Sequence, residues 1–95
     1  MQPKDAYLDR VLGEVEDLSS RVSELNRRFA KQKVSVKLEH YWELACLRTR
    51  FTEFKRRVED LEGAEDRELD RFQEAVEVAW KELLDALETL FAALR

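Results

Sequence analysis

Two residues in this 95-residue chain could act as soft metal ligands, His40 and Cys46, the only histidine and the only cysteine. They are six residues apart, which on a helix places them on different sides. Two helical residues share an ion at the i and i+4 spacing, and zinc would need two further ligands of the same kind. We therefore predict no metal and no cofactor, with His40 either buried or at a boundary and Cys46 an inert thiol.

Carboxylates are abundant and include the neighbouring pairs Glu14/Asp17 and Glu65/Glu68. General acid–base catalysis needs two such groups in a dry pocket with separated pKa values. A di-iron bundle needs Glu-x-x-His motifs, but the only histidine follows Glu39 directly. The sequence contains no glycine-rich phosphate loop and no recognisable Ser–His–Asp arrangement. Because thin helical bundles also offer few concave pockets, we predict that the protein is not an enzyme.

Bulk composition predicts one small helical domain over residues 1–95. Charged residues make up 40% of the chain, with only two glycines and one proline, a balance typical of long exposed helices. The 44% hydrophobic content is too high and too periodic for a disordered chain. A net charge of -4 provides no excess of phosphate-neutralising groups, so we predict no nucleic-acid partner.

The sequence indicates the cellular compartment of the protein only indirectly. A lone cysteine cannot form an intrachain disulfide, which fits a reducing cytoplasm. The first ten residues carry acidic side chains and no apolar stretch of signal-peptide length. No run approaches the roughly 18 apolar residues of a membrane span. We expect a cytoplasmic protein without stable membrane insertion.

Apolar residues repeat at alternating spacings of three and four, the pattern of a helix packed along one stripe. We predict an all-α fold with one helix over about 4–61, a turn over about 62–66 and a second helix over about 67–94. Gly63 is expected to adopt the left-handed conformation after the first helix, and Asp66 to cap the second. The short connection makes the two helices antiparallel neighbours in a helical hairpin.

The register of the long helix fails in the middle. Phe29 and Leu44 are fifteen residues apart, one more than two heptads, which turns the stripe by roughly 100°. Residues 27–40 therefore hold either a re-wound helix or a break, and the lack of a strong stop signal favours continuity. A second apolar stripe here predicts a second neighbouring helix, and its members are Leu38, Tyr41, Trp42 and Ala45.

Helix lengths then predict the assembly. At 1.5 Å per residue the first helix spans roughly 87 Å and the second roughly 42 Å, so half of the first seam lacks cover within the chain. We predict an elongated antiparallel homodimer with a three-helix bundle at each end; the alternative is a monomeric three-helix bundle that bends at residues 31–36. The predicted dimer interface comprises Leu8, Val11, Val15, Leu18, Val22, Leu25, Phe29 and Trp42. The predicted hairpin core comprises Leu44, Leu47, Phe51, Phe54, Val58, Leu61, Leu69, Phe72, Val76, Trp80, Leu83, Leu87 and Leu90.

Two surface features have alternative interpretations. Residues 27–37 form a basic belt that we expect to neutralise the negative end of the second helix, although it could instead bind phosphate, nucleic acid or anionic lipid. Residues 80–94 form a strongly amphipathic helix that could lie on a membrane or dock into a partner. Its acidic polar face favours a position wedged between two other helices.

Several segments together resemble a family of small bacterial coiled-coil proteins, often described as stress-response proteins, without an established mechanism. These segments are DAYLDR near the start, KLEHYWELACLRTRFTEFKRRVEDLE in the middle and AVEVAWKELLDAL near the end. The closest matches are Tyr7, Leu47 with Arg48 and Arg50, and Ala79-Trp80 followed by Leu83. Tyr41, Trp42 and Cys46 depart from the polar, lysine-rich middle of that family. The resemblance implies no catalytic residues.

These observations predict a non-enzymatic coiled-coil homodimer, a structural or stress-linked protein that presents a helical surface to a protein partner. The alternative is an amphipathic-helix binder of a lipid or membrane surface.

Overall fold

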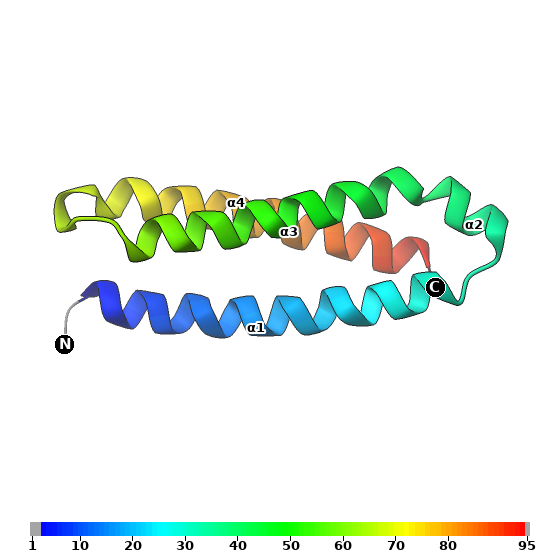
Figure 1. Ribbon diagram of the computed structural model, residues 1–95, viewed down its shortest axis with the longest axis horizontal. Helices are drawn as coiled ribbons and strands as arrows, with labels where there is room; N and C mark the ends of the chain where they lie inside the picture. The colour runs from blue at the N-terminus through cyan, green and yellow to red at the C-terminus, as the bar shows by residue number, and fades with distance from the viewer. Residues whose placement is uncertain (1–2, 95) are drawn as a thin grey trace.

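The computed structural model describes residues 3–94, and this part of the chain is all helical, with no strand. Its elements are α1 (Pro3–Ala30), α2 (Val34–Glu39), α3 (Tyr41–Glu62), the short 3-10 helix η1 (Asp66–Glu68) and α4 (Leu69–Ala93). Figure 1 shows α1, α3 and α4 running side by side, with α2 at one end and the α3–α4 turn at the other. The Cα atoms extend over 50 × 19 × 17 Å.

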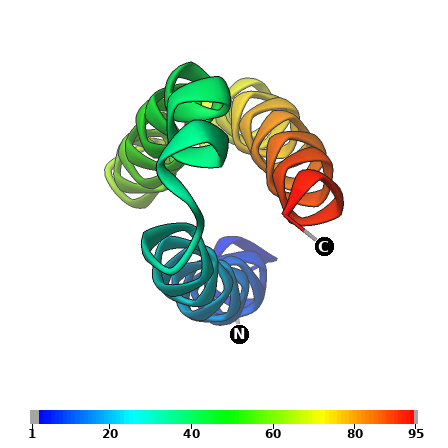
Figure 2. The same cartoon turned by 90° about the vertical axis from the view of Figure 1, so that its right-hand side faces the viewer.

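The three long helices alternate in direction along the chain, so α1 and α4 run one way and α3 runs the other (Figure 1). Seen end-on, they occupy the three corners of a bundle (Figure 2). The backbones of α3 and α4 approach each other more closely than either approaches α1. The larger side chains of α1 span the remaining distance, so α1 closes a core that the α3–α4 hairpin alone would leave open.

The core is a single cluster to which all three long helices contribute. In α1 the inward residues Val11, Leu18 and Leu25 recur every seventh position, the spacing of a bundle seam. Burial of each such side chain contributes about 1.5–3 kcal/mol. The most buried members from the other helices are Leu44, Leu47, Phe54, Val58 and Leu61 in α3, and Val76, Ala79, Leu83, Leu87 and Leu90 in α4. Leu8, Val15, Phe29, Phe51, Leu69, Phe72 and Trp80 are half-buried against this cluster.

The predicted continuous helix over about 4–61 is wrong, because the chain reverses at residues 31–33. The amides of Lys31 and Gln32 bond back to the carbonyls of Arg28 and Phe29 at 3.2 and 3.1 Å, which closes the end of α1. Lys33 is extended, with φ −63° and ψ 153°, and α2 begins at the next residue. The reversal resolves the register mismatch, because both seams now face one core although a straight helix would turn them apart.

The seven α1 residues predicted at the dimer interface are buried or half-buried inside one chain. The helix lengths therefore no longer require a second molecule, since folding back lets the first seam pack on its own α3 and α4. The single chain has the arrangement of the alternative prediction, the three-helix bundle that bends at residues 31–36, although the bend occupies only 31–33. Homodimerisation itself remains a prediction.

The connection between α3 and α4 differs in detail from the predicted turn. Gly63 has φ −89°, so it is not left-handed, and no cap hydrogen bond comes from the side chain of Asp66. Instead, the amide of Glu68 bonds to the carbonyl of Glu65 at 2.8 Å and forms η1. Helix α4 therefore begins at Leu69, two residues later than predicted.

Lys4 ties the start of α1 to this turn. Its ammonium group donates to the carbonyl oxygens of Glu62 and Ala64, at 2.9 and 2.7 Å. The last carbonyls of a helix lack partners within the helix and favour a nearby cation. Lys4 therefore satisfies the exposed end of α3 and fixes the position of α1 against the hairpin.

Replacing Leu18 with Asp should destabilise the single chain, because Leu18 is buried between α1 and the hairpin. The loss of apolar burial and the desolvation of a carboxylate together should cost at least about 3 kcal/mol in the free energy of unfolding. Urea denaturation followed by circular dichroism measures this cost. Ser19→Asp, at the adjacent exposed position, is the matched control. Equal stability of the two variants would show that α1 does not pack as described.

Candidate interaction surface

The residues that might have formed a metal or catalytic centre are dispersed. His40 lies at the joint between α2 and α3, where its Nδ1 is 2.9 Å from Oε2 of Glu43. Cys46 is exposed on the outer side of α3. Within the described residues, no group of three or more His, Cys, Asp or Glu side chains is arranged to hold a metal ion.

Three of the four carboxylates that are neighbours in the sequence form ion pairs with arginines in the structure. Asp17 pairs with Arg21, at 3.3 Å, rather than with Glu14. Glu65 and Glu68 pair with two different arginines, Arg67 and Arg71, at 3.0 and 2.9 Å. Exposed ion pairs of this kind contribute about 0–1 kcal/mol and orient surface side chains. Asp17, Glu65 and Glu68 therefore take part in ion pairs with arginines at the surface.

The amphipathic face of α4 is directed into the bundle. Leu83, Leu87, Leu90 and Leu94 are buried, and Phe91 is half-buried beside them. This places the helix between two others, as its acidic polar face favoured. The same apolar face is consequently not exposed to a membrane or a partner in the folded chain.

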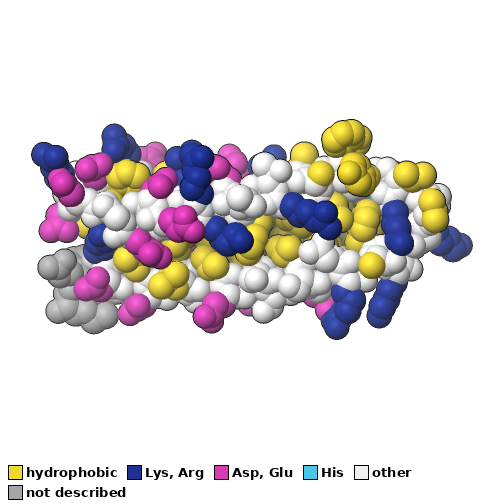
Figure 3. All heavy atoms as spheres, viewed as in Figure 1, with side chains coloured by type: hydrophobic (Ala, Val, Ile, Leu, Met, Phe, Trp, Pro, Cys, Tyr) yellow, Lys and Arg dark blue, Asp and Glu magenta, His cyan; other side chains and the backbone are white. Residues whose placement is uncertain are grey.

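The exposed apolar surface is instead concentrated at the α2 end of the molecule. Val34, Leu38, Tyr41 and Trp42 are 70%, 72%, 58% and 76% exposed, and we call these four residues the apolar end patch. The other large exposed apolar residues in the described chain, Leu12 and Val78, lie singly on α1 and α4. Figure 3 shows the hydrophobic side chains that protrude over this end of the bundle.

The predicted neighbour for the second apolar stripe is therefore absent from the single chain. A helix on each side of residues 38–45 would have covered Leu38, Tyr41 and Trp42. Because the chain reverses just before α2, the end of α1 packs beside the start of α3, where Phe29 shares a shallow groove with Leu44 and Ala45. Leu38, Tyr41 and Trp42 are left largely to solvent. Trp42, predicted at the dimer interface, makes an edge-to-face contact with Tyr41, with ring centroids 5.5 Å apart.

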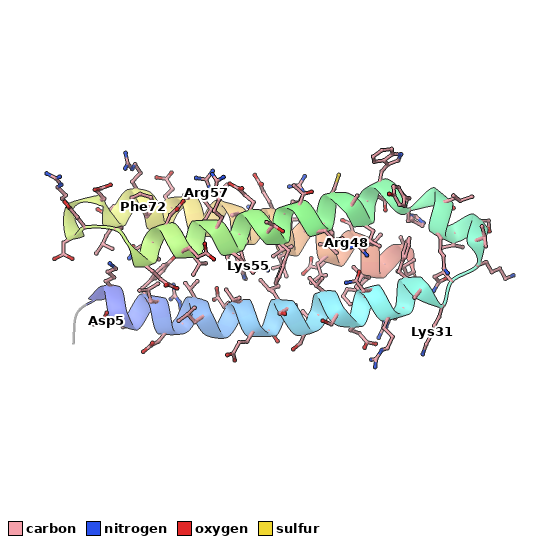
Figure 4. The ribbon with its side chains drawn as sticks, viewed as in Figure 1. Asp5, Lys31, Arg48, Lys55, Arg57 and Phe72 are labelled. Atoms are coloured by element: carbon pink, nitrogen blue, oxygen red, sulfur yellow. The ribbon has the colours of Figure 1, made fainter. Side chains whose placement is uncertain are left out.

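Basic residues lie on the N-terminal side of the apolar end patch, whereas Trp42 shares a groove with Glu43, Glu82 and Asp85. Residues 27–42 carry five basic side chains and one acidic side chain, although the whole chain has a net charge of -4. Arg27 and Arg28 pair with Glu24. Among the described residues, no ion pair includes Lys31, Lys33 or Lys37. Figure 4 labels Lys31, which extends away from the bundle at this end.

One residue of the basic belt, Arg28, lies where the belt was predicted to neutralise the negative end of the last helix, α4. The guanidinium of Arg28 lies 5.2 Å from the ring centroid of Phe91, in the last turns of α4. It is therefore close to the negative end of that helix, where a cation is favourable. The opposite end of the molecule is acidic, because residues 59–70 around the α3–α4 turn carry seven acidic side chains and one basic side chain.

Two shallow grooves lie elsewhere on the surface. One runs between α3 and α4 next to the patch and is lined by Trp42, Cys46, Arg50, Ala86 and Thr89, among others. An ion pair between Arg50 and Glu82, at 3.4 Å, crosses it. No buried polar or charged side chain lines this groove in the described chain.

The other groove lies between α1 and α4, at Tyr7 and Trp80. The hydroxyl of Tyr7 donates to Oε1 of Glu77 at 3.5 Å, and the guanidinium of Arg10 lies 5.0 Å from the Tyr7 ring centroid. Burial raises the pKa of Tyr7, the carboxylate of Glu77 raises it further, and Arg10 opposes the shift. Tyr7 is therefore a packing and hydrogen-bonding residue that joins α1 to α4.

No protein-family model, curated protein or solved structure matches this chain. The resemblance to small bacterial stress-response coiled-coil proteins is accordingly still a prediction. In the described part of the chain, no helix is both long enough and apolar enough to cross a bilayer.

Sequence reasoning did not identify Val34 or the exposure of the apolar end patch. The available signal was the second stripe itself, which lies off the seam and follows Lys33 and Lys37 in the sequence.

The raised pKa of Tyr7 predicts a loss of stability in alkaline solution. The folded chain holds the phenolic proton more tightly than the unfolded chain, so its contribution is complete below the ordinary tyrosine pKa of about 10 and is lost as the pH rises through the raised value. Unfolding free energies measured across this range should decline more steeply for the parent than for Tyr7→Phe. In Tyr41→Phe, tyrosinate absorbance reports Tyr7 alone; a midpoint at or below 10 would contradict the described packing.

Proposed function

We propose that this protein is a non-enzymatic interaction module that binds a partner through the α2 end of its helical bundle. The observation that carries the proposal is the concentration of four large exposed apolar side chains within nine residues, Val34 to Trp42. The remaining large apolar residues are mostly buried, so the patch does not reflect a generally loose core. Grouped exposed apolar residues with a polar rim are typical of interaction sites.

The apolar end patch is held on a defined support. Val36, which is half-buried against the core, anchors α2 from its inner side. The amide of Leu44 bonds to the carbonyl of His40 at 3.1 Å, so α3 follows α2 with a single-residue joint. Val34 and Leu38 are four residues apart in α2, which places them on one side of that helix, and Trp42 lies in the first turn of α3. A partner would therefore meet a preformed surface.

The sequence analysis predicts a protein partner without locating its binding site, and the amphipathic-lipid alternative loses its original basis because the apolar face of α4 lies in the core. A role in a stress response depends on the family resemblance alone. The exposure of the apolar end patch supports a binding location at the α2 end of the molecule, away from the acidic turn.

The proposal predicts that the apolar end patch is dispensable for folding. Leu38→Ser combined with Trp42→Ser should change the unfolding free energy by no more than about 0.5 kcal/mol, because exposed side chains contribute little to stability. In the source cells, p-benzoylphenylalanine placed at position 42 should form discrete photo-adducts, with either protein or lipid. The same residue at position 78, also exposed and apolar, is the matched control. Equal adduct yields at both positions, or none at position 42, would refute the proposed docking end.

We also propose that any homodimer of this chain forms by exchange of α1. Residues 31–33 are Lys-Gln-Lys, without the glycine or proline that would enforce a turn. If this segment becomes helical, α1 can leave its own hairpin and make the same contacts with the hairpin of a second copy. The helix from α1 through α3 would then extend over roughly 90 Å.

Sedimentation equilibrium with small-angle scattering tests this exchange. A dimer should have twice the chain mass of 11.3 kDa and a longest dimension near that of the extended helix. Inserting Gly-Ser-Gly between Lys33 and Val34 should shift the population toward monomer, because a flexible loop favours the closed chain. A dimer that persists unchanged after the insertion would exclude exchange of α1.

A further inference from the structure

We infer that the partner of the α2 end is an anionic lipid surface, with the apolar end patch at the headgroup level and the neighbouring lysines at the lipid phosphates. This inference rests on the proposed function and specifies its partner. It concerns α2 and the first turn of α3, not the amphipathic face of α4, which is buried.

The side chains of the apolar end patch fit the membrane interface. Tryptophan and tyrosine concentrate at the boundary between headgroups and acyl chains, because each combines an apolar ring with a polar group. Tyr41 and Trp42 are adjacent and largely exposed at the start of α3, and the aliphatic Val34 and Leu38 are exposed on the preceding helix, α2. One end of the bundle thus presents two interfacial aromatic residues and two aliphatic residues that can enter the acyl boundary.

The charge of this end complements an anionic surface. The side chains of Lys31, Lys33 and Lys37 lie in the same short segment as the apolar end patch, and no ion pair in the described chain includes them. Each lysine held near an acidic leaflet strengthens binding about fivefold, so three of them contribute on the order of 100-fold. The acidic side chains around residues 59–70 lie at the far end of the bundle, where the surface potential is screened.

A second copy fits this end less well. Two α2 ends that met would bring Lys31, Lys33 and Lys37 of each chain, which no described ion pair includes, close to the same lysines of the other chain. Like charges in contact oppose such an interface and would leave the lysines unpaired. A protein groove would also have to enclose a protruding end (Figure 3), whereas a lipid surface adapts to it.

Trp42 provides a direct probe, because the chain contains only two tryptophans. In Trp80→Phe, the emission reports Trp42 alone. We expect a blue shift on addition of vesicles of phosphatidylcholine with phosphatidylglycerol, and quenching by lipids brominated on the acyl chains. Vesicles of phosphatidylcholine alone should bind at least tenfold more weakly. In the matched variant Trp42→Phe, the half-buried Trp80 should show neither the shift nor the quenching.

The Trp42 emission also tests the role of the three lysines and whether the anionic group belongs to a lipid, a free anion or a protein. Lys31→Gln, Lys33→Gln and Lys37→Gln together should weaken vesicle binding on the order of 100-fold, with the helical circular dichroism unchanged. Raising the salt concentration should have a similar effect on the parent. Inorganic phosphate and poly-glutamate, probes for a free anion and an acidic protein, should leave the Trp42 emission unshifted.

The remaining outcomes would overturn the inference. Unshifted Trp42 emission with every vesicle excludes lipid docking, and equal binding to neutral and anionic vesicles excludes the role of the lysines. A shift with poly-glutamate but not with vesicles assigns the end to an acidic protein. In each case photo-adducts at position 42 still decide the proposed function independently, since they require only that the α2 end binds something.

Discussion

The structure depends on the burial of the α1 seam against the α3–α4 hairpin. Val11, Leu18 and Leu25 extend from one helix across to side chains of the other two, and their burial has no substitute within α1 itself. A chain of this composition cannot leave seven large apolar residues in water, because their burial contributes more than the net stability of a small domain. Reversal of the chain at residues 31–33 satisfies this requirement at the loss of a few helical hydrogen bonds.

The same reversal accounts for the exposed surface. The extra residue between the Phe29 and Leu44 seams means that two apolar stripes cross the joint, and only one of them can face the core. The core takes Leu44 and Leu47, while Leu38, Tyr41 and Trp42 remain outside. The constraint that folds the bundle therefore also creates its most distinctive surface. Folding alone does not require apolar side chains at these exposed positions, because polar residues there would be compatible with the same bundle. The apolar character of the surface therefore favours a role in binding.

Periodicity predicted most of the helical content and nearly all of the core. The three-and-four spacing identifies Leu44, Leu61 and Leu83 as inward residues regardless of which chain covers them. It could not decide whether the α1 seam packs on its own chain or on another, because the same contacts form in both. Lys-Gln-Lys at residues 31–33 has good helix propensity, so a local reading favoured continuity and long-range burial overrode it. The hydrogen bonds of Lys4 could not be predicted from the local sequence either, because the carbonyls that it contacts belong to residues about sixty positions away.

The separation of charge along the molecule has a physical consequence of its own. With three lysines outside any described ion pair near one end of a 50 Å body and seven acidic groups near the other, the chain carries a permanent electric moment along its long axis. In the field of a charged object such a body experiences a torque while it is still diffusing, so it is oriented before it makes contact with that object. Productive encounters then need less rotational search, and successive molecules at low ionic strength would tend to align head to tail.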